Sequence, residues 1–124
     1  MAKTIMVVDD STTIRMSLKN SLEIAGMAVI TASDGAIGLE KLKTGPKPDL
    51  IITDINMPNM GGIEFIGKAR AVPGFRFIPI LVLSTESMQA KRDEAKKLGA
   101  TGWLVKPVGG ADLIKIIKQV LPGA

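Results

Sequence analysis

Short apolar runs alternate with longer amphipathic stretches along this chain, and that alternation limits the choice of fold more than any other feature. The runs are rich in Val and Ile, and their length and composition are typical of strands that are buried on both faces. They cover Ile5–Val8, Ala28–Thr31, Leu50–Thr53, Ile78–Leu83 and Gly102–Val105. The sequence therefore predicts five strands, each separated from the next by a longer connection.

The stretches between these runs carry helix signals. The first begins near Ser11–Thr13, has Ile14, Leu18 and Leu22 at helical spacing, and ends at Gly26. The other four helices are expected from about Gly35 to Lys43, after Gly62, over roughly Met88–Leu98 and from near Ala111.

Five strands that alternate with five helices favour parallel pairing through right-handed crossover connections. We therefore expect a doubly wound α/β sandwich, with a single domain spanning residues 1–124. In such folds, binding sites lie just outside the carboxyl ends of the strands. The residues that follow each strand are therefore the candidates for function.

The residue types that the chain lacks exclude several classes of chemistry. It contains no His and no Cys, which rules out a Ser-His-Asp triad, a histidine general base, ordinary zinc sites and disulfides. The net charge of +4 is scattered along the chain, and only three Phe and one Trp are available for base stacking, so we expect no nucleic-acid partner. No apolar run is long enough for membrane insertion, and a cytoplasmic location is the default expectation.

Polar residues follow four of the five predicted strands. They are Asp9 and Asp10 after the first strand, Asp54 after the third, Ser84 and Thr85 after the fourth, and Lys106 after the fifth. Hard oxygen ligands suit Mg²⁺, and a lysine suits the oxygens of a phosphoryl group carried by a neighbouring aspartate. Each motif alone has an ordinary explanation as a helix cap or a turn. Their joint occurrence in strand order favours a metal-assisted phosphoryl site.

Four short motifs, "VVDD", "DINMPNMGG", "VLST" and "VKP", occur in this order across essentially the whole chain. In this combination the sequence resembles the receiver domains of two-component signalling, specifically response regulators of the CheY type. The resemblance implies a flavodoxin-like sheet with strand order 2-1-3-4-5. It also implies that Asp54 accepts the phosphoryl group and that Ser84 and Lys106 contact the oxygens of that group.

The same resemblance implies a Mg²⁺ site. The ligands that it implies are Asp10, Asp54 and the backbone carbonyl of Asn56, with Asp9 acting through a metal-bound water. The segment after the acceptor fits this role, because Met57-Pro58 keeps the backbone extended. The pair Gly61-Gly62 then permits a sharp entry into the third helix.

Several residues near the site are expected to modulate the switch. Thr85 stands where a small alanine is frequent in the family, so we expect it to narrow access for water or a phosphatase. Asn56 and Glu86 are expected to flank the path of an attacking water. Trp103 occupies the family's switch-aromatic position, where Tyr or Phe is usual, and we expect its larger indole ring to move only partly on activation.

Together these features predict a stand-alone phosphorylation switch of chemotaxis or motility signalling, a signalling protein rather than an enzyme. A histidine kinase would donate the phosphoryl group, and a phosphatase is a further possible partner of this expected monomer. A protein target would bind the face formed by the fourth helix, the fifth strand and the fifth helix. On the fifth helix, Ile114 and Leu121 are expected to add apolar surface to that face.

Three other functions remain open on the sequence alone. The protein could serve as a phosphate sink for another regulator. A Mg²⁺-dependent phosphatase similar to the haloacid-dehalogenase group would carry an Asp-x-Asp motif after the first strand, whereas Asp9 and Asp10 are adjacent. A flavin or nucleotide carrier would need a phosphate-binding loop at that point, where "DDSTT" instead places acids.

Overall fold

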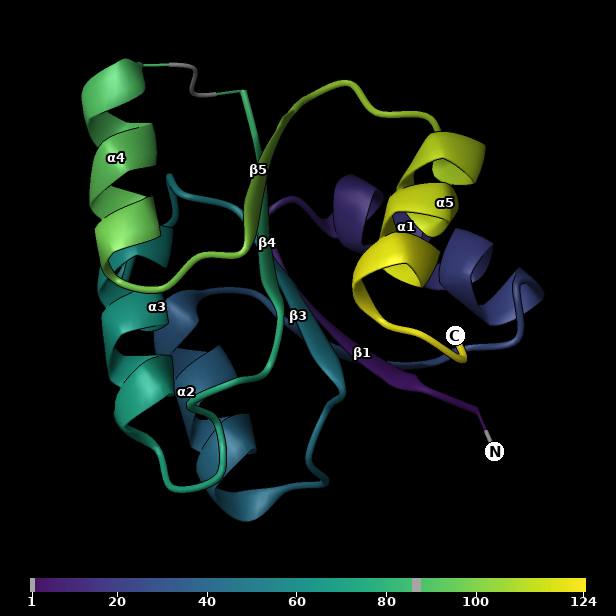
Figure 1. Ribbon diagram of the computed structural model, residues 1–124, viewed down its shortest axis with the longest axis horizontal. Coiled ribbons are helices and arrows are strands. Elements are labelled where there is room, and N and C mark those ends of the chain that lie inside the picture. The colour runs from purple at the N-terminus through teal and green to yellow at the C-terminus, as the bar shows by residue number, and fades with distance from the viewer. Residues whose placement is uncertain (1, 86–87) are drawn as a thin grey trace.

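The computed structural model of the protein describes residues 2–85 and 88–124, in which strands and helices alternate from β1 to α5 (Figure 1). The strands are β1 Thr4–Val8, β2 Ala28–Ala32, β3 Leu50–Thr53, β4 Ile80–Ser84 and β5 Gly102–Val105. The helices are α1 Thr12–Ile24, α2 Gly35–Thr44, α3 Gly62–Ala71, α4 Gln89–Lys97 and α5 Gly110–Val120. None of the helices in these two segments is long and apolar enough to cross a membrane.

All five strands are parallel and lie in the order β2-β1-β3-β4-β5. This arrangement confirms the predicted doubly wound fold and the predicted strand order. The strand β3 lies in the middle of the sheet, and each of its residues is buried. The last residues of β1 and β3 are level, since Val8 pairs with Thr53, while Thr53 pairs with Val82 and β4 continues two residues further to Ser84. The segments that follow these strands therefore leave the sheet at the same edge.

The element boundaries differ from the predicted ones by at most two residues, and those of β3 and β5 match the prediction. The largest difference is at β4, which begins at Ile80 and extends to Ser84, whereas the apolar run begins at Ile78. Pro79 has no backbone N–H and contributes only its carbonyl, which accepts a hydrogen bond from the Ile51 N–H at 2.9 Å. The regular ladder therefore starts after the proline.

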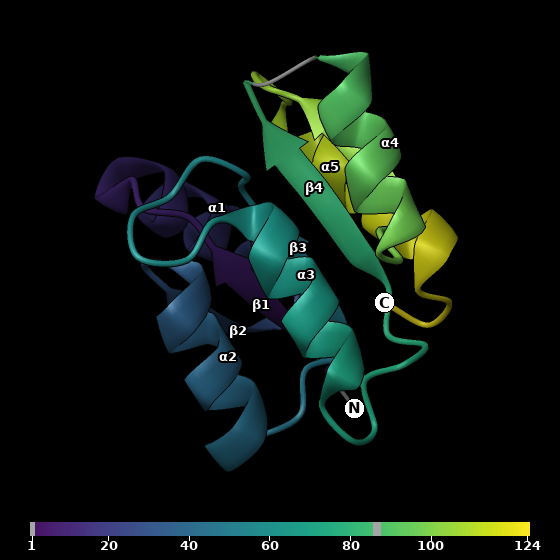
Figure 2. The ribbon, with the colours of Figure 1, turned by 90° about the vertical axis from the view of Figure 1, so that its left-hand side faces the viewer.

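Helices cover both faces of the sheet in two layers (Figures 1 and 2). Alternate strand residues point to opposite faces. Met6 and Val8 of β1 join the core beneath α2, α3 and α4, whereas Ile5 and Val7 join the core beneath α1 and α5. Every one of these four side chains is buried. The continuous apolar runs of the sequence therefore reflect two cores that share one sheet.

Helix α5 is less exposed than its sequence pattern predicts. Leu113 and Ile117 are fully buried beneath it. Ile114 and Leu121, predicted to add free apolar surface, are half-buried and pack against the same core. The apolar stripe of α5 is wide because the helix lies in the angle between the sheet and α1, where two sides of the helix are covered.

Candidate functional site

The carboxyl ends of β1, β3 and β5 bring together one lysine and two aspartates. The Lys106 Nζ atom donates a hydrogen bond to Asp9 Oδ2 at 2.8 Å and another to Asp54 Oδ2 at 3.0 Å. Asp9 and Asp54 are 3% and 9% exposed, respectively, so both ion pairs are largely shielded from water. The ammonium group therefore joins the first, third and fifth strands at a single point.

The second oxygen of each aspartate has a fixed partner as well. Asp9 Oδ1 accepts a hydrogen bond from the Ser11 N–H at 2.9 Å, and Asp54 Oδ1 accepts one from the Ile55 N–H at 2.7 Å. The Arg15 guanidinium donates to the Asp9 carbonyl at 2.6 Å. Because every oxygen of these two carboxylates is engaged, both groups are held in a defined orientation before any ligand binds.

The charge on Lys106 is stabilised by its partners. Burial lowers the pKa of Lys106, but the hydrogen bonds and the negative charges of Asp9 and Asp54 outweigh that effect and raise the pKa above its ordinary value. The side chain therefore remains an ammonium ion throughout the neutral range. Its positive charge is available to any anionic group that reaches this edge.

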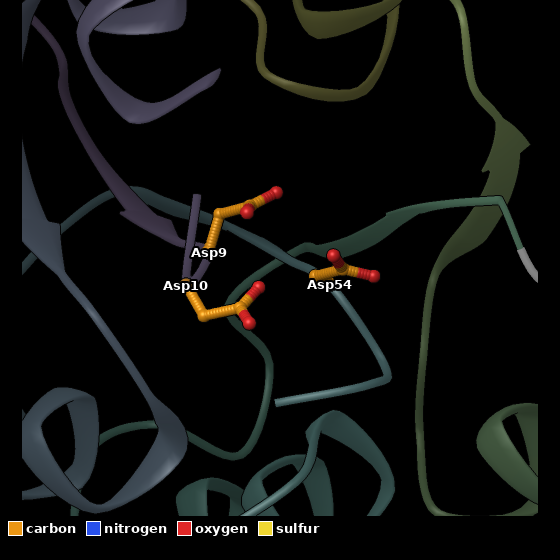
Figure 3. Close-up of side chains that lie close together, drawn as sticks. All are labelled: Asp9, Asp10 and Asp54. Atoms are coloured by element: carbon orange, nitrogen blue, oxygen red, sulfur yellow. The ribbon is translucent and has the colours of Figure 1, made fainter. Parts of the chain in front are cut away.

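Asp10 completes an acidic cluster with Asp9 and Asp54 (Figure 3). One carboxylate oxygen from each of the three residues lies within 4.8 Å of the other two. Asp10 is exposed to solvent, whereas the other two residues are buried. Three carboxylates face one ammonium group, and oxygen donors are the ligands that Mg²⁺ prefers. The donor set therefore fits a hard divalent cation that enters from the solvent side.

The segment after Asp54 turns back tightly against it. The Gly62 N–H donates to the Ile55 carbonyl at 2.9 Å. A Cβ atom at Gly62 would lie only 2.0 Å from the Asp54 carbonyl oxygen, so no other residue fits there. Asn56, predicted to supply a backbone carbonyl to the ion, is exposed in this turn beside Asp54. Its role as a ligand remains a prediction.

The predicted switch residues lie around the same edge. Ser84 is fully buried at the end of β4, and its carbonyl accepts a hydrogen bond from the Lys106 N–H at 2.9 Å. Thr85 is exposed, and Glu86 lies outside the described residues. Trp103 on β5 is half-buried, packs against the core beneath α4, and lines a pocket of about 310 Å³ between α4 and β5. The backbone of Ser84 is thus bonded to that of Lys106, whereas Trp103 lies two residues before the end of β5.

Sequence reasoning missed two contributors to the geometry of this edge. One is Arg15, whose contact with the Asp9 carbonyl has no signature in the sequence. The other is Asp34, which caps α2 by accepting a hydrogen bond from the Ile37 N–H at 2.9 Å. An Asp directly before the start of a predicted helix is a recognised capping signal and could have identified it.

Comparisons with known proteins agree with this geometry. Residues 5–118 match the model of the response regulator receiver domain. The chain is 39% identical over 104 residues to chemotaxis protein CheY1 of Helicobacter pylori, covering 83% of this chain and 84% of that protein. It is 36% identical over 117 residues to CheY-3 of Vibrio cholerae, covering 94% and 89%, respectively.

A solved structure of Vibrio cholerae CheY4 superposes with a TM-score of 0.92 at 42% identity and covers 98% of this chain and all of that one. Sequence and fold therefore point to the same group of signalling proteins, which act with histidine kinases and downstream targets. The chain belongs to the response regulator receiver domain family, and within it to the CheY-like members.

Proposed function

We propose that this protein is a phosphorylation switch in which Asp54 accepts a phosphoryl group from a histidine kinase. The observation that carries the proposal is the Lys106 ammonium bound between Asp9 and Asp54 at 2.8 and 3.0 Å. A lysine with a purely structural role needs only one carboxylate partner. Lys106 has two, and a third carboxylate, Asp10, adds negative charge beside them. This excess of oxygen donors supports a site that binds a cation and an incoming anionic group.

The transfer follows from the groups present. A carboxylate oxygen of Asp54 attacks the phosphorus atom of the kinase phosphohistidine, so that an O–P bond forms while the P–N bond breaks. The bonding electron pair leaves with the imidazole nitrogen. Lys106 then donates to an oxygen of the transferred group, which replaces one of its carboxylate partners. The same site would later admit water, which returns the acyl phosphate to a carboxylate and free phosphate.

The acidic cluster would hold Mg²⁺ during these steps. Asp10, Asp54 and the Asn56 carbonyl are the proposed direct ligands, and Asp9 is proposed to act through a water. When bound, the ion offsets the charge of the phosphoryl oxygens. Without it, Asp54 approaches an anionic donor while two further carboxylates lie nearby, and repulsion opposes the reaction.

We propose that Ser84, Thr85 and Trp103 link the phosphoryl group to partner binding. The Ser84 hydroxyl would be drawn to the phosphoryl oxygens, and Trp103 would shift toward the space that this vacates. Thr85 would limit access of water or a phosphatase to the adduct, as would Asn56 and Glu86. The target would bind the face of α4, β5 and α5, where Met88 and Val105 are exposed. An output in chemotaxis is proposed from the named relatives.

Acetyl phosphate and Mg²⁺ provide a direct test of the acceptor by intact-mass spectrometry. The wild type should gain one acid-stable, base-labile phosphoryl group per chain, and Asp54→Asn should gain none because its near-isosteric amide cannot form an acyl phosphate. Asp112→Asn, which alters an exposed acid in the first turn of α5, is the matched control and should behave as the wild type. Full phosphorylation of Asp54→Asn would refute the assignment.

A further inference from the structure

The turn that follows Asp54 is fastened to the first turn of α2 by two hydrogen bonds. The Asn59 Nδ2 atom donates to Asp34 Oδ2 at 2.9 Å, and the Gly35 N–H donates to the Met60 carbonyl at 3.0 Å. Asp34 is only 4% exposed whereas Asn59 is exposed, so the contact is partly shielded from competing water. The start of α2 is thereby joined to the loop between β3 and α3.

This contact uses Asp34 fully. Its other oxygen accepts the capping hydrogen bond from the Ile37 N–H, so one carboxylate serves both the helix and the turn. The hydrogen bond from Asn59, followed by the one from Ile37, lowers the pKa of Asp34 below its ordinary value. The carboxylate is therefore charged at neutral pH, and the bond from the Asn59 amide is charge-assisted.

The turn itself has little freedom while this contact is intact. Asn59 has a φ angle of +64°, which non-glycine residues adopt infrequently. A Cβ atom at Gly35 would lie 2.7 Å from the Met60 carbonyl oxygen, so the close approach of α2 to the turn depends on glycine. The far end of the turn is fixed where Gly62 meets Asp54. Residues 56–61 are thus anchored at both ends and at their tip.

We propose that Asp34 and Asn59 are positioning residues that set the affinity of the acidic cluster for its divalent cation. They hold the turn that carries the Asn56 carbonyl in a single conformation. The cation therefore does not have to select that conformation from several. When the competent conformation is only partly populated, the apparent affinity falls in proportion. This inference rests on the proposed Mg²⁺ site. It adds a contact outside that site that sets the affinity of the site for the cation.

Two single substitutions remove the contact while sparing the rest of the fold. Asp34→Ser keeps a side-chain oxygen that can cap α2 but leaves no second oxygen to accept from the Asn59 amide. Asn59→Gly removes the amide that donates to Asp34 and places at position 59 a residue that tolerates positive φ. By calorimetric titration with MgCl₂, each should weaken Mg²⁺ binding about two- to twelvefold, which corresponds to the net strength of one protein hydrogen bond.

The double variant Asp34→Asn/Asn59→Asp exchanges the amide and the carboxylate, which restores a donor opposite an acceptor without changing the net charge. It should recover most of the lost affinity. The matched control is Thr44→Ala, which removes a side-chain hydrogen bond of 2.9 Å to the Glu40 carbonyl at the other end of α2. It should leave Mg²⁺ affinity at the wild-type value, whatever its melting temperature.

The results separate this inference from the proposed function. Wild-type affinity in both single variants, with a lowered melting temperature, would show that the contact serves stability alone and would overturn the inference. Equal losses in Thr44→Ala would overturn it too, since affinity would then follow general stability. Absence of Mg²⁺ binding by the wild type would refute the proposed cation site, and this inference with it.

Discussion

Two partly buried cations, Lys106 and Arg70, lie at opposite ends of the sheet and are bound in opposite ways. Lys106 contacts two ionised side chains at the carboxyl end. Arg70 donates to the backbone carbonyls of Phe75, Ile78 and Gly99 at 2.8, 2.5 and 2.6 Å, in the loops that lead into β4 and β5. The pKa of Lys106 is raised by its partners, whereas burial lowers the pKa of Arg70.

The difference separates a cation that can exchange its partners from one that fixes the backbone. The planar fork of Arg70 matches three fixed acceptors, and none of these can change its charge. Lys106 is a point charge on a flexible stem, and under the proposed function the charge around it changes when a phosphoryl group or a metal ion arrives. One cation therefore maintains the geometry of two loops, and the other can exchange partners during a reaction.

The largest expected effect comes from removing the cation that fixes the backbone. Arg70→Met leaves three backbone carbonyls without their donor, so the free energy of unfolding should fall by roughly 2–4 kcal/mol. Arg70→Lys should recover only part of this loss, because a single ammonium cannot reach all three acceptors. Urea denaturation measures both variants. A change of less than about 0.5 kcal/mol in Arg70→Met, the size of an ordinary surface substitution, would contradict the structural role.

A second prediction concerns the negative charge of the acidic cluster at the carboxyl end of the sheet. In the wild type, Mg²⁺ at about 100 times its Kd should add roughly 2.7 kcal/mol to the free energy of unfolding. Asp10→Ala should lose this effect, yet melt at a higher temperature than the wild type without metal, because one of three clustered negative charges is gone. Thermal melts with and without MgCl₂ test both statements. Continued stabilisation of the variant by Mg²⁺ would exclude Asp10 as a ligand.

A smaller effect should appear at alkaline pH. Because the folded-state pKa of Lys106 is raised, its stabilising contribution is fully present below the unfolded pKa of about 10.4 and is lost as the pH rises through the folded value. The difference in unfolding free energy between wild type and Lys106→Met should therefore shrink in that window. Lys115→Met, at an exposed position on α5, is the control and should show no comparable trend. A pH-independent difference would argue against the charged pair.

The smallest expected change is spectroscopic. Trp103 is the only indole in the chain, and its emission should change when beryllofluoride and Mg²⁺ mimic the phosphoryl group. Ser84→Ala should reduce that response, because the proposed link from the phosphoryl oxygens to β5 passes through the Ser84 hydroxyl. Identical responses in both proteins would remove Trp103 from the proposed switch, without affecting the assignment of Asp54.

The fold and the acidic cluster could be predicted because both depend on patterns that are local in sequence. Apolar runs gave the strands, and parallel pairing then required Asp9, Asp54 and Lys106 to meet at one edge. The boundaries of β4 were less predictable, because Pro79 interrupts the ladder inside an apolar run. Each of these results follows from a residue type and its position relative to a strand end.

Other contacts could not be predicted because they join backbone or loop atoms, whose positions no strand or helix pattern fixes. Arg70 binds carbonyl groups, which every residue carries and no sequence pattern marks. Asn59 reaches Asp34 across 25 residues, and only the conformation of the turn brings them together. The exposure of Ile114 on α5 was misjudged for a related reason, since a helical pattern does not show how many neighbours cover the helix.

The separation of the site residues along the chain has a consequence for folding. Asp9 and Asp54 come together as soon as β1 pairs with β3, whereas Lys106 arrives only when β5, the last strand, has added to β4. Chains are synthesised from the amino terminus. A nascent sheet without β5 therefore concentrates three carboxylates without their ammonium, and the repulsion destabilises it. The acidic residues thus disfavour partly built intermediates and make completion of the fold more cooperative.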